Sequence, residues 1–314
     1  MNRSFPLAAV LVALAAVAVE AQPPAPVRPP PALVRQLWAD LEPDDLLRRE
    51  GIGQLPEAVM VERRDLDGDG RAEWFVEGTR TCGNANCPRW IYRQLPSGSF
   101  QQVYAGAGAR LDVLPARVNG WPSLMSIGHM SAAEAVYRRS EFDGRRYRWR
   151  DMEYRERERG RADVVRYHLT RTERAGRART VLDPMRAGGG LWLSATADRC
   201  APGAARACST TRLELQSATL PAGRVCVRYR SEEGEGPVYQ SAAGDRWCGV
   251  TTPVTLPGGG QGRRLVVTPA RRDLERMANG YDAHLVGPGL PGKLDLDAVG
   301  ALLAFAGSLE ESRN

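Results

Sequence analysis

The sequence predicts a mainly β protein with two β-rich domains and short peripheral helices. Glycine (33 residues) and proline (22 residues) are both plentiful among the 314 residues, which favours many turns over a helical bundle. Short runs of alternating apolar and polar residues also recur between turn residues from residue 58 to residue 267. The chain is long enough for two domains of ordinary size.

Residues 1–21 have the pattern of a secretory signal peptide. Arg3 supplies a positive charge, an apolar run extends from Leu7 to Val19, and small residues allow cleavage after Ala21. The run is short for a transmembrane span, although an uncleaved anchor is the alternative. No cysteine directly follows it, so a lipid anchor is not indicated. We therefore expect a periplasmic or secreted protein with no membrane span after cleavage.

The first domain is expected to cover residues 33–185, after a proline-rich, extended spacer at residues 22–32. Leucines recur at helical spacing from Leu33 to about Arg49, and Pro43 divides this stretch into two short helices. An antiparallel meander should follow, with Asp143-Gly144 as a strong hairpin signal. The strand candidates are residues 58–64, 73–78, 89–95, 100–105, 111–114, 123–127, 135–142, 147–149, 164–170 and 177–182.

The glycine-rich residues 186–190 predict a linker, and residues 191–314 are expected to form the second β-rich domain. This domain should end in a helix at 296–311, whose apolar stripe indicates core packing. The other expected elements are a helix at 273–278 and strands at 191–197, 211–216, 224–229, 236–240, 245–250 and 263–267.

The loop between the first two expected strands has the spacing of a calcium site. Asp65, Asp67 and Asp69 place carboxylates at loop positions 1, 3 and 5, and a glycine at position 6 permits a sharp turn. The Arg71 carbonyl and the Glu73 carboxylate stand at positions 7 and 9. Calcium prefers six to eight oxygen ligands, so this loop predicts one structural Ca²⁺ ion with a dissociation constant of ~10⁻⁴–10⁻³ M.

This loop is not an EF-hand. An EF-hand requires a glutamate at position 12, where this chain has Val76, and its flanks are helical whereas these are strand-like. A solvated acidic turn without an ion is the alternative interpretation.

The DxDGDGxxE pattern between two strands resembles the calcium loop of the FG-GAP/VCBS repeat superfamily. More narrowly, residues 58–149 resemble small exported bacterial proteins that have one such loop. The matching segments here are the loop, the run from Cys82 to Trp90, Asn119-Gly120, and the run from Phe142 to Tyr147. The resemblance implies a β fold and bound calcium, and it implies no reaction. The superfamily includes integrin-like propellers, which contain several such motifs, so the single motif here is too few for a complete propeller.

The sequence contains an even number of cysteines: Cys82, Cys87, Cys200, Cys208, Cys226 and Cys248. In an oxidising compartment six cysteines suggest three disulfides. The short spacing favours Cys82–Cys87. The other four have three possible pairings, of which we expect Cys200–Cys208 with Cys226–Cys248. A zinc site is the competing interpretation, but no CxxC pair is present and the three histidines are scattered.

The charge pattern argues against a nucleic-acid partner. The net charge is +6 and the pI about 9.2, and Lys293 is the single lysine beside many arginines. Between Arg138 and Arg179, however, arginines alternate with carboxylates. Mixed charges at this density indicate solvated strand faces, so we expect no nucleic acid to bind.

No nucleophile elbow, phosphate loop, dinucleotide fingerprint or zinc-protease motif is present. We therefore favour a non-catalytic binding or structural module of the cell envelope. Trp90 and Trp121 could contact an envelope protein or glycan, or lie in the core. The alternative is a hydrolase of cell-wall or extracellular polymer that uses Asp112 or Glu134 as acid and base, which requires two carboxylates about 5–10 Å apart.

Overall fold

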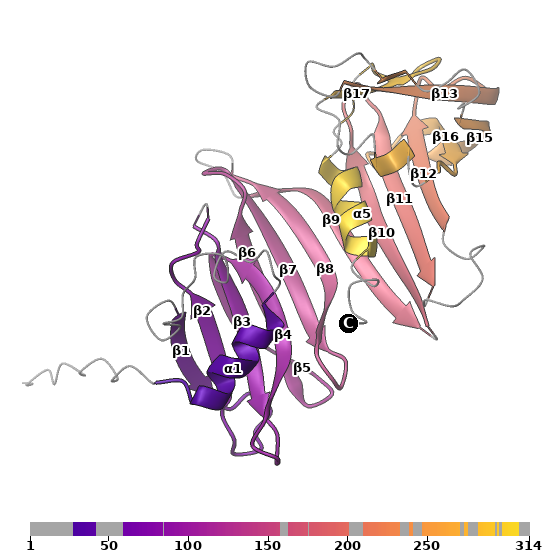
Figure 1. Cartoon of the computed structure of the whole chain (residues 1–314). Helices are drawn as coiled ribbons and strands as arrows, with labels where there is room; N and C mark the ends of the chain where they lie inside the picture. The colour runs from indigo at the N-terminus through magenta and orange to yellow at the C-terminus, as the bar shows by residue number, and fades with distance from the viewer. Residues whose placement is uncertain are drawn as a thin grey trace, which may run out of the picture.

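The computed structural model confirms the mainly β class and contains two antiparallel sheets, one small and one large (Figure 1). No described helix is long and apolar enough to cross a lipid bilayer. The structure describes residues 28–41, 59–83, 85–157, 163–174, 176–200, 210–232, 239–240, 247–270, 273–275, 282–292, 294 and 297–307. The expected signal peptide and the second of the two expected N-terminal helices lie outside these residues.

The small sheet has four strands in the order β1-β2-β3-β4, and helix α1 (Pro31–Asp40) covers one of its faces. The strands are β1 (Val59–Arg64), β2 (Glu73–Gly78), β3 (Cys87–Gln94) and β4 (Phe100–Gly108). Leu33, Leu37 and Leu41 pack against the tryptophans and other apolar residues of this face. The helix begins at Pro31, inside the expected spacer, because proline suits the first turn of a helix.

The large sheet begins where the small one ends, with β5 at its edge and β6 to β12 following in sequence order. Gly108 lies where the chain passes from β4 of the small sheet to β5 of the large sheet. An added Cβ atom at this position would meet the Ile127 carbonyl oxygen at 2.8 Å. The strands are β5 (Arg110–Val118), β6 (Trp121–His129), β7 (Glu134–Phe142), β8 (Tyr147–Glu156), β9 (Val164–Arg174), β10 (Arg177–Arg186), β11 (Trp192–Cys200) and β12 (Thr210–Ser217).

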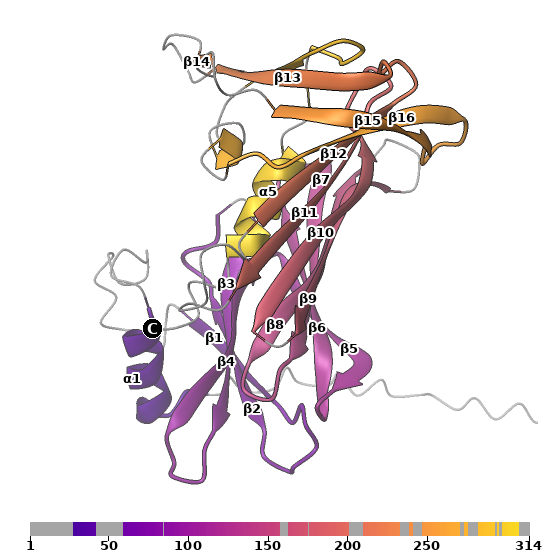
Figure 2. The ribbon, with the colours of Figure 1, turned by 90° about the vertical axis from the view of Figure 1, so that its right-hand side faces the viewer.

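The last strands turn across the end of the large sheet (Figure 2). Beyond β12 the order continues with β16 (Gln261–Val267), β15 (Trp247–Thr255), β13 (Gly223–Glu232) and β14 (Tyr239–Gln240). Strand β17 (Asp282–Val286) pairs with β13 and was missed from the sequence. Residues 273–275 form a helical turn within the expected 273–278 helix, and the terminal helix is α5 (Asp297–Gly307).

Two further apolar clusters hold these layers together. The inter-sheet core joins the small sheet to β6, β7 and β8, and it consists of Leu66, Ile91, Val103, Tyr104, Trp121, Leu124, Phe142 and Tyr147. The α5 core lies between the inner face of the large sheet and α5, and it draws on residues from Val136 to Leu303. Residues 187–190, within the expected linker, form the tight turn between β10 and β11. These two strands are hydrogen-bonded to each other, so the same sheet continues on both sides of the expected linker.

The outer face of the large sheet, which points away from the α5 core, explains the alternating charges. Many of its arginines pair with carboxylates on the same or the adjacent strand. Examples are Arg139 with Asp151, Arg179 with Asp198, and Arg212 with Glu214. Because residues alternate between faces along a strand, one face of each strand holds these ion pairs while the other holds the core.

Candidate functional site

The expected calcium loop is the connection between β1 and β2. The two strands pair in register up to Arg64 opposite Glu73, so Asp65 to Ala72 form a closed loop at the end of a hairpin. Gly68 and Gly70 have φ angles of 83° and 85°, a left-handed conformation that costs glycine little. These two positions let the loop fold back on itself.

The loop's own amides orient its carboxylates. Asp65 accepts hydrogen bonds from the amides of Gly68 and Gly70, at 2.8 and 3.0 Å. Asp67 accepts one from the Asp69 amide at 3.1 Å. Each carboxylate oxygen has two lone pairs, so an oxygen that accepts an amide proton can still bind a cation.

Three of the expected ligands come together. One carboxylate oxygen from each of Asp65, Asp67 and Glu73 lies within 4.8 Å of the other two. Asp69 does not join this cluster, and its carboxylate instead accepts a hydrogen bond from the Arg71 amide at 2.7 Å. The structure therefore supports a core of three carboxylates, with Asp69 at its margin.

Glu73 is the least exposed of these acids, with 3% of its surface accessible. Burial, with a contribution from the negative charges of Asp67 and Asp69, raises the pKa of its carboxyl group to about 7, although the Leu66 amide donates a hydrogen bond to it. A buried carboxylate beside two others is stable when a cation compensates its charge. The donor set is all oxygen, which fits a hard cation such as Ca²⁺.

Leu66 connects this loop to the inter-sheet core. Its side chain is 4% exposed and packs among aromatic residues of both sheets. Arg117, at the end of β5, donates hydrogen bonds to the carbonyls of Leu66 and Gly120, at 3.0 and 2.6 Å. Neither Leu66 nor Arg117 was predicted from the sequence, where the signal was one large apolar residue, Leu66, inside an otherwise polar loop.

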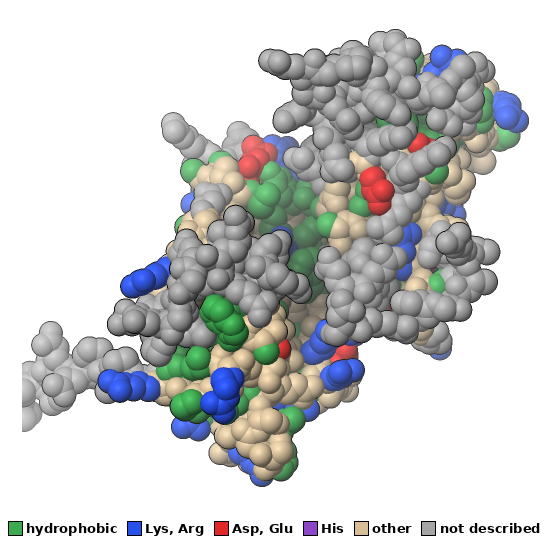
Figure 3. All heavy atoms as spheres, in the orientation of Figure 1, with side chains coloured by type: hydrophobic (Ala, Val, Ile, Leu, Met, Phe, Trp, Pro, Cys, Tyr) green, Lys and Arg blue, Asp and Glu red, His purple; other side chains and the backbone are tan. Residues whose placement is uncertain are grey.

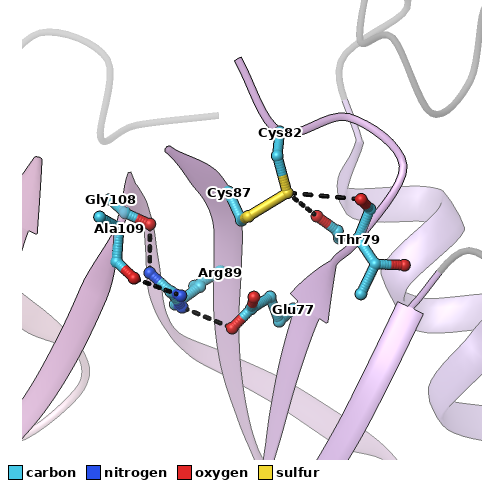
Figure 4. Close-up of a disulfide and its surroundings, with 8 residues drawn as sticks. Glu77, Thr79, Cys82, Cys87, Arg89, Gly108 and Ala109 are labelled. Atoms are coloured by element: carbon cyan, nitrogen blue, oxygen red, sulfur yellow. Dashed lines mark hydrogen bonds and ion pairs between the residues drawn. A yellow bond between two sulfur atoms is a disulfide. The ribbon is translucent and has the colours of Figure 1, made fainter. Parts of the chain in front are cut away.

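The Cys82–Cys87 disulfide forms as expected, at the end of the β2–β3 hairpin (Figure 4). Beside it, Arg89 forms an ion pair with Glu77 at 2.8 Å and donates hydrogen bonds to the carbonyls of Gly108 and Ala109. Because Gly108 and Ala109 connect the two sheets, Arg89 fixes the small sheet to the start of the large one.

The second expected disulfide, Cys226–Cys248, joins directly opposed residues of β13 and β15. Cys200 is also disulfide-bonded. Its expected partner, Cys208, lies outside the described residues, so that pairing stays a prediction.

The structure does not bring together the two acids of the hydrolase alternative. Asp112 lies opposite Met125, which lies opposite Arg139, whereas Glu134 is five residues along β7 from Arg139. At ~3.4 Å per residue this is a separation of about 17 Å along the strand, with two strand spacings in addition. Asp112 is paired with Arg110, and Glu134 accepts hydrogen bonds from Tyr154 and Ser131, which lower its pKa.

The two tryptophans considered as partner contacts are core residues. Trp90 is 7% exposed and lies under α1, and Trp121 is 4% exposed and stacks on Phe142 with ring centroids 4.4 Å apart.

Comparisons of this chain with protein-family models, with curated proteins and with solved structures find no match.

Proposed function

We propose that this chain is an exported, non-catalytic binding or structural module of the cell envelope, stabilised by one Ca²⁺ ion and by disulfides. The convergence of the Asp65, Asp67 and Glu73 carboxylates in one loop carries the calcium part of the proposal. The disulfides support an oxidising compartment. The wide separation of Asp112 and Glu134 favours the non-catalytic alternative over the hydrolase.

The proposed ion has a structural role in two places. It neutralises the loop carboxylates at the end of the β1–β2 hairpin, and it fixes the loop conformation that inserts Leu66 between the sheets. Calcium binding should therefore stabilise the contact between the sheets as well as the hairpin.

Calcium is expected to raise the melting temperature of the purified protein. With a dissociation constant of ~10⁻⁴–10⁻³ M, 10 mM Ca²⁺ would add about 1.4–2.7 kcal/mol to the free energy of unfolding. For a chain of this size that is a shift of about 3–6 °C. Differential scanning calorimetry in chelator, in 10 mM Ca²⁺ and in 10 mM Mg²⁺ measures the shift, and we expect Mg²⁺ to give less than Ca²⁺.

Asp67→Ala should abolish this shift, because it removes one of the three converging carboxylates. Asp143→Ala is the matched control, since Asp143 also accepts amide hydrogen bonds in a hairpin turn and lies outside the cluster. A full calcium shift in Asp67→Ala, or no shift in the unmodified protein, contradicts the proposal.

The calcium shift should also grow with pH. The pKa of Glu73 is raised in the folded protein without calcium, so folding favours its protonated form. That contribution is fully present below pH ~4.5 and is lost as the pH rises to about 7, where calcium then replaces the proton. Melting curves at pH 5, 6, 7 and 8 should show the smallest shift at pH 5. A shift that is constant over this range would contradict the role given to Glu73.

A further inference from the structure

Arg138 differs from the arginines of the outer face in where it lies. On β7 it alternates with Arg139, and it lies opposite Met152 of β8, a buried residue of the α5 core. The inner face of the sheet therefore holds Arg138, whereas Arg139 on the outer face pairs with Asp151 and Glu141.

Arg138 has no anionic partner in the described part of the chain. Its Nε atom is buried without a hydrogen bond, and no described carboxylate forms an ion pair with the guanidinium group. Burial lowers the pKa of Arg138, and the acidic groups that oppose this shift are the phenols of Tyr104 and Tyr167. A partly buried guanidinium group without a counter-ion is costly, so an anion from outside the chain would be bound favourably there.

Aromatic and apolar side chains surround this guanidinium group. It lies 4.9 Å from the centroid of the half-buried Trp149 ring, and the neighbouring Tyr154 and Tyr167 rings stack 5.0 Å apart. Strand β8 lies between the small sheet and α5 (Figure 1). The space-filling view shows hydrophobic side chains gathered in a hollow between these two parts of the molecule (Figure 3).

The charged side chains on the inner face of β7 indicate which end of the hollow would bind an anion. Glu134 and Arg138 are four residues apart and share the inner face of the strand, which places them about 14 Å apart. Val136 lies between them and belongs to the α5 core. A bound anion would thus lie at Arg138 and away from the negative charge of Glu134.

We propose that the inner face of β7 and β8 binds an anionic amphiphile, a molecule with an apolar chain and one carboxylate group. Arg138 binds the carboxylate, and the partly buried Trp149 and Tyr154 side chains contact the apolar chain. A sugar ring fits less well, because the Trp149 face is covered by the guanidinium group and the two tyrosine rings cover each other.

A second hollow in the surface gives weaker evidence for a ligand site. A cleft of about 280 Å³ opens between β1 and β5, and its apolar floor includes Phe75 and Leu111. Its three arginines, Arg64, Arg89 and Arg110, each form an ion pair with a carboxylate. No charge in that cleft is left for a ligand to neutralise, in contrast with Arg138.

Isothermal titration of the full-length protein with dodecanoate tests the proposal, in chelator so that calcium does not precipitate the probe. We expect saturable binding of one dodecanoate, at least ~10-fold tighter than dodecanol, since dodecanol lacks the charge that Arg138 recognises. Arg138→Gln should weaken dodecanoate binding by ~10-fold or more and leave dodecanol binding unchanged. Arg139→Gln, on the opposite face of the same strand, should change neither.

Three outcomes overturn this inference: no dodecanoate binding, equal affinity for dodecanoate and dodecanol, or the same loss in Arg139→Gln as in Arg138→Gln. The comparison of the two probes on the unmodified protein remains decisive if Arg138→Gln does not fold. This site is independent of the calcium loop, so Asp67→Ala should bind dodecanoate normally. The two proposals can therefore fail separately.

Discussion

Replacing Leu66 with alanine is expected to lower the free energy of unfolding by about 2–5 kcal/mol, the usual cost of truncating a buried leucine. The side chain is 4% exposed and lies in the inter-sheet core with Trp121, Phe142 and Tyr147. Its removal leaves a cavity at the only point where the calcium loop enters that core, among the residues that the structure describes. Urea denaturation followed by tryptophan fluorescence measures the change.

The same substitution should also reduce the calcium-induced rise in melting temperature, because the loop then lacks its apolar contact with the large sheet. Met60→Ala is the matched control, since Met60 belongs to the same hairpin and its side chain is 59% exposed. We expect the control to change stability by less than ~0.5 kcal/mol. Equal effects of the two substitutions would show that Leu66 does not contribute to the contact between the sheets.

Removing the Cys226–Cys248 disulfide, by replacing both cysteines with serine, should lower the free energy of unfolding by about 3 kcal/mol. The bond closes a segment with a sequence separation of 22, and the loss of stability grows with the length of the closed segment because a longer loop gains more freedom in the unfolded chain. Strand β13 also pairs with β14, β15 and β17, so its attachment to β15 affects the whole end of the large sheet.

The Cys82–Cys87 bond provides the comparison. Its sequence separation is 5, so the same double replacement with serine should cost only about 2 kcal/mol. Urea denaturation of both double variants, in calcium, measures the difference. A larger loss for the short-range bond would contradict the chain-entropy explanation and indicate a direct role of that bond in the native hairpin.

The strands were predictable because alternation of apolar and polar residues is a local pattern. Strand β2 matches the expected range of residues 73–78, β1 and β7 differ from theirs by one residue at one end, and β12 differs by one residue at each end. Strand β8 extends to Glu156, well beyond the expected residue 149, because its charged outer face masks the pattern while Met152 on the inner face enters the α5 core. Strand β17 was not predicted, because it is short and is defined by its pairing with β13, which is distant in the sequence.

The functional features also divide into those predictable from the sequence and those that depend on the tertiary structure. By itself the sequence determined the convergence of the Asp65, Asp67 and Glu73 carboxylates and the Cys82–Cys87 pair, because these residues are close in the chain and short-range geometry brings them together. Only the tertiary structure decided that Leu66 packs between two sheets and that Arg138 lies on the inner face with no counter-ion among the described residues. Both depend on strands that are distant in sequence, and the register of such strands is set by the packing of the whole sheet.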